Sequence, residues 1–171
     1  MQLRSALDAL YFGAGCVAAL LLVGTLAMVV TGIAGRLIGF HVPGTDAYAG
    51  YCMAGSGFLA LAHTLKRREH IRVTLLLEHS SAAGKHALEL WSLAVAALLA
   101  LLFAIFSVRL AYQSWDFNDI STASDATPLW IPQLAMAAGT VILAIALVDE
   151  LILEWRRQRD ATTPSVATFN E

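Results

Sequence analysis

The densest charge in the sequence lies near its centre, in the stretch KRREHIRVTLLLEH over residues 66–79. Guanidinium and ammonium groups bind phosphates and carboxylates, and arginine does so through forked hydrogen bonds that lysine cannot reproduce. We therefore predict that this stretch contacts either lipid headgroups or the acidic groups of a protein partner. The candidate interface residues are Lys66, Arg67, Arg68, His70, Ile71, Arg72 and Val73.

The other reactive residue types do not form a recognisable catalytic or metal-binding pattern. Cys16 and Cys52 lie in apolar segments, and the sequence has no CxxC pair. The histidines show no HExxH motif and no paired spacing typical of metal or haem ligands. These histidines are His41, His63, His70, His79 and His86. We therefore expect no catalytic residues, no metal site, no cofactor and no enzymatic activity.

Composition places these residues in a membrane protein. Hydrophobic residues make up 58% of the 171 residues and charged residues only 14%, with a mean hydropathy of +0.66. A soluble domain of this length could not bury so much apolar surface. The net charge of −2 and the pI near 6.2 give no broad basic field, so we expect no nucleic-acid binding.

Four apolar segments are long enough, or nearly so, to cross a bilayer, since about 20 helical residues span a hydrocarbon core of about 30 Å. They cover residues 12–34, 47–65, 88–111 and 130–153, and the second is the weakest candidate because it is short and begins with Gly and Tyr residues. The predicted fold is an all-α integral membrane domain over residues 1–155 with four transmembrane helices. Residues 156–171 form a polar tail that we expect to be disordered.

The tryptophans lie at the ends of the last two segments. Trp91 and Trp130 stand at their starts, and Trp115 and Trp155 lie just past their ends. Amphipathic indole rings settle at the headgroup level of a membrane. We therefore predict that these four residues are membrane-interface anchors.

Lysine and arginine are unevenly divided among the predicted connections. Nine of the eleven lie in the N-terminal segment, the connection over residues 66–86 and the tail, whereas only Arg36 and Arg109 lie elsewhere. The positive-inside rule therefore places both termini in the cytoplasm and residues 112–129 outside. The segment HIRVTLLLEHSS is too short to span and too apolar for a free loop, so we expect an amphipathic turn or helix along the interface.

The centres of the predicted spans hold no charged side chain. The charged residues nearest to them stand close to segment ends, where their side chains can reach the interface. They are Asp46, Glu89, Arg109, Asp149 and Glu150. Because an ion path or proton relay usually retains ionisable groups inside the membrane, this distribution argues against an antiporter or a lone ion channel.

Rows of small residues recur every four positions and predict close contacts between helices. One row lies in each of the last three segments, where lipid-facing filler is the alternative. The rows are Gly50 with Ala54, Ala96 with Ala100 and Ala104, and Ala135 with Gly139.

The stretch LKRREHIRVTLL resembles the signature of the small membrane subunit of tripartite ATP-independent periplasmic (TRAP) transporters, the DctQ-like family. Arg67, Arg68, His70, Ile71 and Val73 carry this resemblance. The family usually has an acidic residue where Asp46 stands, so the resemblance adds Asp46 to the candidate partner or lipid interface. TPLWIPQLAMAAG is similar to the family's Pro-x-Trp-Ile start of the fourth helix. The chain departs from the pattern at Thr74, where the family often has Asp, and in GTDAY, which has fewer acids than usual.

The resemblance implies a small permease subunit in a bacterial inner membrane. Such a subunit scaffolds a large membrane subunit that carries the substrate and sodium sites, and a periplasmic binding protein delivers an organic acid or similar solute. Two alternatives remain open: a self-associating four-helix channel or structural protein, and a small membrane oxidoreductase. The oxidoreductase would require reactive cysteines or paired intramembrane histidines, and co-purification of a large membrane protein would favour the transporter.

Overall fold

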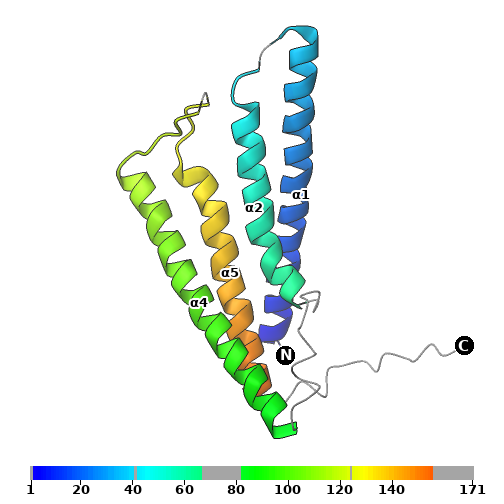
Figure 1. Ribbon diagram of the computed structural model, residues 1–171, viewed down its shortest axis with the longest axis vertical. Coiled ribbons are helices and arrows are strands. Elements are labelled where there is room, and N and C mark those ends of the chain that lie inside the picture. The colour runs from blue at the N-terminus through cyan, green and yellow to red at the C-terminus, as the bar shows by residue number, and fades with distance from the viewer. Residues whose placement is uncertain (1, 41, 67–81, 124, 156–171) are drawn as a thin grey trace, which may run out of the picture.

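The computed structural model describes residues 2–40, 42–66, 82–123 and 125–155. These residues form four helices: α1 (Gln2–Ile38), α2 (Thr45–Lys66), α4 (Ala82–Asp116) and α5 (Trp130–Trp155) (Figure 1). The predicted all-α fold with four long helices is confirmed. The predicted interfacial segment after the second span and the predicted polar tail lie outside the described residues.

The helices are longer than the apolar segments that predicted them. α1 begins at Gln2 instead of residue 12, and α4 runs from Ala82 to Asp116 instead of over 88–111. At about 1.5 Å per residue, the 35 residues of α4 extend for about 52 Å, well beyond a hydrocarbon core of about 30 Å. The apolar runs therefore cover only the middle parts of α1 and α4, and backbone hydrogen bonding continues past them at both ends.

Local sequence explains where α1 ends and α2 begins. Gly39 has a φ of 77° and directly follows the last residue of α1, and the amide of Phe40 donates to the carbonyl of Gly35 over 2.9 Å. A positive φ after a helix is the usual helix stop, and glycine adopts it without strain. Gly44 has a φ of 82° and precedes Thr45, the first residue of α2. The two glycines thus let the chain reverse in a short connection.

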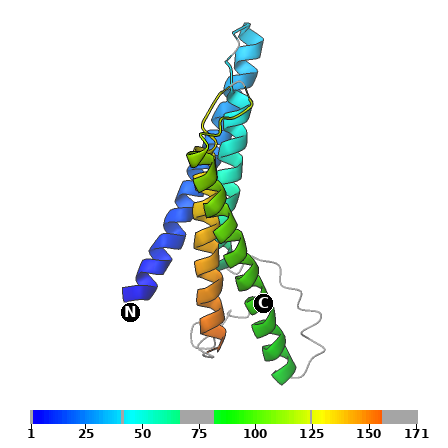
Figure 2. The ribbon, with the colours of Figure 1, turned by 90° about the vertical axis from the view of Figure 1, so that its left-hand side faces the viewer.

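The four helices lie side by side in the order α4, α5, α2, α1 (Figure 1). α1 packs antiparallel to α2, α4 packs antiparallel to α5, and α2 and α5 join the two pairs. Figure 2 shows the layer from its side, where α1 and α4 diverge on either side of α5 toward the end that holds the N-terminus. The arrangement is an open layer rather than a closed bundle.

Small residues form the contacts inside this layer. On α4 the buried residues recur at intervals of three and four, and they include Ala97, Ala100, Ala104, Ser107, Ala111 and Ser114. Ala100 and Ala104 belong to the core cluster with α5, and Ala96 packs against it, so the predicted row on this helix is confirmed. Small side chains allow backbones in lipid to approach closely, where dispersion replaces the hydrophobic driving force.

The other two predicted rows had opposite outcomes. A Cβ atom on Gly139 would lie 2.6 Å from the backbone of Phe58, so α5 contacts α2 there as predicted. The predicted contact at Gly50 and Ala54 is wrong within this chain. Both residues are exposed, and a Cβ on Gly50 would meet nothing within 4 Å. α2 instead turns Gly55 inward, between Leu21 of α1 and Ala135 of α5.

Three of the described helices are long and apolar enough to cross a membrane by length and composition: α1, α4 and α5. α2 has 22 residues, enough to cross, but it is the least apolar of the four. It lies between α1 and α5, which reduces its contact with lipid. Its polar residues, such as the buried Thr45 and Ser56, are therefore shielded by neighbouring helices.

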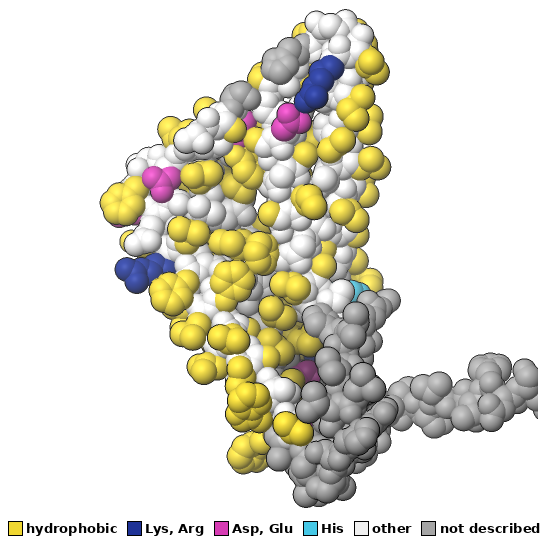
Figure 3. All heavy atoms as spheres, in the orientation of Figure 1, with side chains coloured by type: hydrophobic (Ala, Val, Ile, Leu, Met, Phe, Trp, Pro, Cys, Tyr) yellow, Lys and Arg dark blue, Asp and Glu magenta, His cyan; other side chains and the backbone are white. Residues whose placement is uncertain are grey.

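Large apolar side chains cover the outside of the layer (Figure 3). In α1, only 6% of the most apolar stretch is buried, and α4 exposes Leu, Ile and Phe side chains along most of its length. A membrane protein can leave such side chains on its surface because lipid tails are as apolar as they are. The layer therefore presents broad apolar faces to lipid or to partner helices.

Candidate partner and lipid interface

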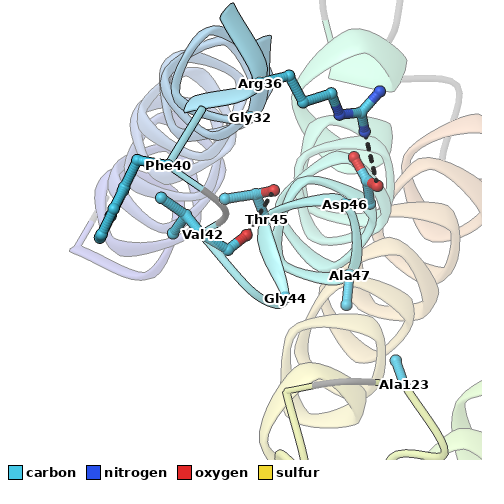
Figure 4. Close-up of a pocket in the computed structure, with 9 residues that line it drawn as sticks. All are labelled: Gly32, Arg36, Phe40, Val42, Gly44, Thr45, Asp46, Ala47 and Ala123. Atoms are coloured by element: carbon cyan, nitrogen blue, oxygen red, sulfur yellow. Dashed lines mark hydrogen bonds and ion pairs between the residues drawn. The ribbon is translucent and has the colours of Figure 1, made fainter. Parts of the chain in front are cut away.

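An exposed ion pair joins α1 to α2 at the end of the layer where these helices connect. Arg36 Nη2 lies 3.2 Å from Asp46 Oδ2, and the two side chains are 68% and 85% exposed (Figure 4). Asp46 stands in the first turn of α2, where the helix dipole favours a negative charge. An ion pair this exposed adds little stability. The predicted site residue Asp46 thus lies at the surface of the layer.

A small cavity lies beside this ion pair, between the end of α1 and the start of α2 (Figure 4). Its volume is about 120 Å³, and Gly32, Thr45 and Ala123 are among its lining residues. Pockets that bind organic molecules usually measure about 300–1,000 Å³. The cavity is therefore too small for an organic solute.

The connection between α4 and α5 is attached to α2 by a polar cluster, which we call the loop latch: Tyr48, Tyr51, Ser121, Asp125 and Thr127. The Tyr51 hydroxyl lies 2.8 Å from Ser121 Oγ and 3.2 Å from Asp125 Oδ2, and Ser121 Oγ donates to Asp125 Oδ1 over 3.0 Å. The Thr127 and Tyr48 hydroxyls lie 3.2 Å apart, within hydrogen-bond distance. The loop latch thus holds residues 117–123 and 125–129 against the first two turns of α2.

Hydrogen bonding also sets the charge state of the loop latch. The hydrogen bond from the Thr127 side chain, with further ones from Ser121 and Tyr51, lowers the pKa of Asp125 below its ordinary value of 3.8. These donors favour the ionised carboxylate, which is the form that accepts their hydrogen bonds. Asp125 is therefore ionised at neutral pH.

A second charged pair lies at the opposite end of α2. Lys66 Nζ donates to Asp149 Oδ2 over 2.5 Å, which joins the last residue of α2 to α5. Lys66 Nζ also lies 5.3 Å from the ring centroid of Tyr11, a residue of α1 that is 2% exposed. A cation over an aromatic face is attracted to it. Three helices therefore meet around one lysine.

Sequence reasoning placed Lys66 and Asp149 near segment ends but did not pair them. The signal was their opposite charge at the cytoplasmic ends of the second and fourth predicted spans. The sequence-based prediction also missed that Glu150 and Glu154 on α5 are buried. Their exposed fractions are 8% and 6%, so they do not extend toward the interface.

Of the remaining predicted interface residues, the four tryptophans are described by the structure and those of the basic stretch are not. Arg67, Arg68, His70, Ile71, Arg72 and Val73 lie outside the described residues. Trp91, Trp115 and Trp155 are exposed and Trp130 is half-buried. Trp91 lies in the third turn of α4 and Trp115 in its last turn, because the helix extends past the apolar segment at both ends. Their role as membrane anchors stays a prediction.

The side chains of His63 and Cys52 pack against glycines of α1, whereas Cys16 is exposed. The ring of His63 faces Gly15 of α1, where a Cβ would lie 2.9 Å from the ring, and Cys52 Sγ faces Gly24 in the same way at 3.3 Å. Within the part of the chain that the structure describes, no three His, Cys, Asp or Glu side chains are grouped to hold a metal ion.

Comparison with known proteins decides the family. The model of the DctQ component of tripartite ATP-independent periplasmic transporters matches residues 25–157, which is more than half of the chain. The chain belongs to the DctQ family. It is therefore the small membrane subunit of a TRAP transporter, a multi-pass membrane protein and not an enzyme. A search of curated proteins finds no match.

The DctQ match includes most of the features described above. It covers α2, α4 and α5, the loop latch, both residues of the Lys66–Asp149 pair and the basic stretch. It begins in the middle of α1, so Tyr11 lies outside it. The resemblance read from the sequence is confirmed, and the family implies the other components of a tripartite system.

Proposed function

We propose that this DctQ protein is a scaffold that binds the large membrane subunit of its transporter and supports sodium-driven uptake of an organic acid or similar solute. A periplasmic binding protein delivers the solute to that complex. The open helix layer carries this proposal, because it leaves broad apolar faces that a second membrane protein can cover. A closed bundle of four helices would offer much less surface for a partner helix.

The positions of the charged residues support the same division of labour. In the described part of α2, Asp46 and Lys66 are 20 residues apart, so the charged pairs at its two ends are separated by about 30 Å. That distance equals the thickness of the hydrocarbon core. An ion pathway needs ionisable groups between the levels of these two pairs, and α2 has no Asp, Glu, Lys or Arg between Asp46 and Lys66. We therefore assign the transport path to the large subunit.

We infer that the end of α2 with Lys66 faces the cytoplasm and that the loop latch faces the periplasm, as the distribution of lysine and arginine predicts. In a background without Cys16 and Cys52, Ser80→Cys and Thr122→Cys should react with a membrane-impermeant thiol reagent from opposite sides. Reaction of both positions from the same side would overturn this orientation.

The partner surface includes Asp46 at the periplasmic end and the basic stretch at the cytoplasmic end. Asp46 is exposed, so its carboxylate is accessible to a donor from another chain. Arg67, Arg68 and Arg72 supply forked donors for acidic groups of the partner or for phospholipid. His70, Ile71 and Val73 complete that surface in the sequence.

Reconstitution tests the scaffold directly. Proteoliposomes should take up solute only when they contain this chain and the large subunit, with the binding protein outside and an inward sodium gradient. An ionophore that collapses the gradient is the control for coupled uptake. Uptake by this chain alone, or full uptake by the large subunit without it, would contradict the scaffold.

A further inference from the structure

An open apolar groove runs along α5 between the first turns of α1 and the middle of α4. It has a volume of about 710 Å³. Leu7 comes from α1, Ile105 and Val108 come from α4, and Val141 and Ile145 lie along α5. Along the groove, α1 and α4 diverge while α5 continues between them (Figure 2).

The groove is about as deep as one leaflet of a bilayer. Its lining residues on α5 run from Val141 to Ile152, which at about 1.5 Å per residue is about 17 Å. Half of a hydrocarbon core of about 30 Å is about 15 Å. From the level of Asp149 the groove extends eight residues toward the membrane interior, to Val141, which is about 12 Å and most of one leaflet, and Ile152 lies on the headgroup side of Asp149.

The groove is polar only at the end near the headgroups. Asp149 is the one charged residue among its lining residues, and it is paired with Lys66. Lys66 does not line the groove itself, but its ammonium contacts the Asp149 carboxylate that does, and the Asp149 and Lys66 side chains are 20% and 23% exposed. The result is a site with an apolar body and, toward the headgroups, one carboxylate that carries the Lys66 ammonium as its ion partner.

We propose that this groove binds a phospholipid with an ethanolamine headgroup, from the leaflet on the Lys66 side. One acyl chain lies along α5, the phosphate accepts hydrogen bonds from the Lys66 ammonium, and the headgroup ammonium lies beside the Asp149 carboxylate. A chain in the groove touches three helices, whereas a chain on a flat helix face touches one, and dispersion increases with the number of such contacts.

The length of the groove favours a lipid over a helix of another protein. A transmembrane helix is about 10–12 Å in diameter and crosses both leaflets, so a groove built for it would continue past the middle of the membrane. The inference does not depend on the proposed scaffold function, because the lipid site belongs to this chain alone.

The test uses the full chain in phosphatidylethanolamine vesicles that contain a small fraction of phosphatidylethanolamine with a photoactivatable diazirine in one acyl chain. After illumination, mass spectrometry of peptides should find cross-links concentrated on the lining residues of α4 and α5. Ile145→Trp and Val108→Phe, which fill the groove from its two walls, should each abolish that concentration. Leu102→Trp is the matched control, because Leu102 is an exposed residue of α4 that does not line the groove.

Two results would overturn the proposal. Cross-links spread evenly over the exposed apolar faces, and unchanged by Ile145→Trp and Val108→Phe, would mean that lipid contacts the groove only as ordinary solvent. Loss of the lipid cross-links when the large subunit is present, with protein cross-links in their place, would mean that a protein helix occupies the groove. Each variant is first tested for monodisperse elution in detergent, so that a folding defect is not mistaken for a lost site.

Discussion

Gly139 is the position where α5 comes closest to α2, and one methyl group there should separate the two central helices. A Cβ on Gly139 would lie 2.6 Å from the carbonyl carbon and oxygen of Phe58 and 2.8 Å from its Cβ. Ordinary contacts begin at 3.4 Å, so the helices must move apart by about 0.8 Å, the difference between 3.4 and 2.6 Å. The atoms in the way belong mainly to the backbone and cannot rotate aside.

The cost of this movement follows from what the same two helices bury. Ala62 on α2 and Ala146 on α5 are both 0% exposed, and their contact loosens when the helices separate. Overpacking of this kind costs about 1–3 kcal/mol, and the better helix propensity of alanine offsets up to about 1 kcal/mol of it. We therefore expect Gly139→Ala to lower the free energy of unfolding by about 1–2 kcal/mol.

The assay is unfolding in detergent micelles by increasing fractions of sodium dodecyl sulfate, with the unfolded fraction measured by pulse proteolysis. Gly57→Ala is the matched control, because a Cβ on Gly57 would meet nothing within 4 Å. The control should unfold at the same detergent fraction as the natural chain or at a higher one. If Gly139→Ala unfolds together with the control, the close approach of α2 and α5 is wrong.

Three further predictions concern the loop latch and the basic stretch. Tyr51→Phe removes a hydroxyl that bonds the loop, worth about 1 kcal/mol, so hydrogen exchange over residues 117–129 should accelerate. Because the pKa of Asp125 is lowered, the loop latch should persist from pH 7 down to about pH 4. It should loosen only as the pH falls below 3.8, the ordinary pKa of an aspartate. Asp125→Asn should abolish that pH dependence. His70→Ala combined with Arg72→Lys should lower the ratio of large to small subunit recovered after detergent extraction, without changing membrane orientation, and an unchanged ratio would leave the basic stretch as a lipid anchor.

The four long helices of the described residues and the family could be predicted from the sequence, because both depend on local patterns. Long apolar runs indicate spans whatever their neighbours are, and the basic motif is read within a dozen residues. The contacts between helices could not be predicted in the same way. Gly50 and Gly139 stand in similar rows of small residues, yet only Gly139 meets a neighbouring helix.

The physical reason is that lipid and a neighbouring helix are both apolar environments. In water, a buried face differs from an exposed face in polarity, so periodicity reveals it. In this chain, the buried residues of α4 are mostly alanines and serines, while leucines and phenylalanines face outward. The pairing of Lys66 with Asp149 was hidden for a related reason, because it requires α2 and α5 to be neighbours, and the apolar runs do not specify which spans are adjacent.

The contacts of α2 explain how the least apolar helix can hold a fixed depth in the membrane. Arg36 of α1 pairs with one end of α2 and Asp149 of α5 pairs with the other, about 30 Å away. A shift of α2 by one helical turn, about 5.4 Å, would break both pairs and move either Asp46 or Lys66 into the hydrocarbon, where an unpaired charge is costly. Because α1 and α5 contact α2 between these pairs as well, the depth of α2 fixes theirs. A scaffold needs this rigidity, since its partner surface must stay at one level of the bilayer.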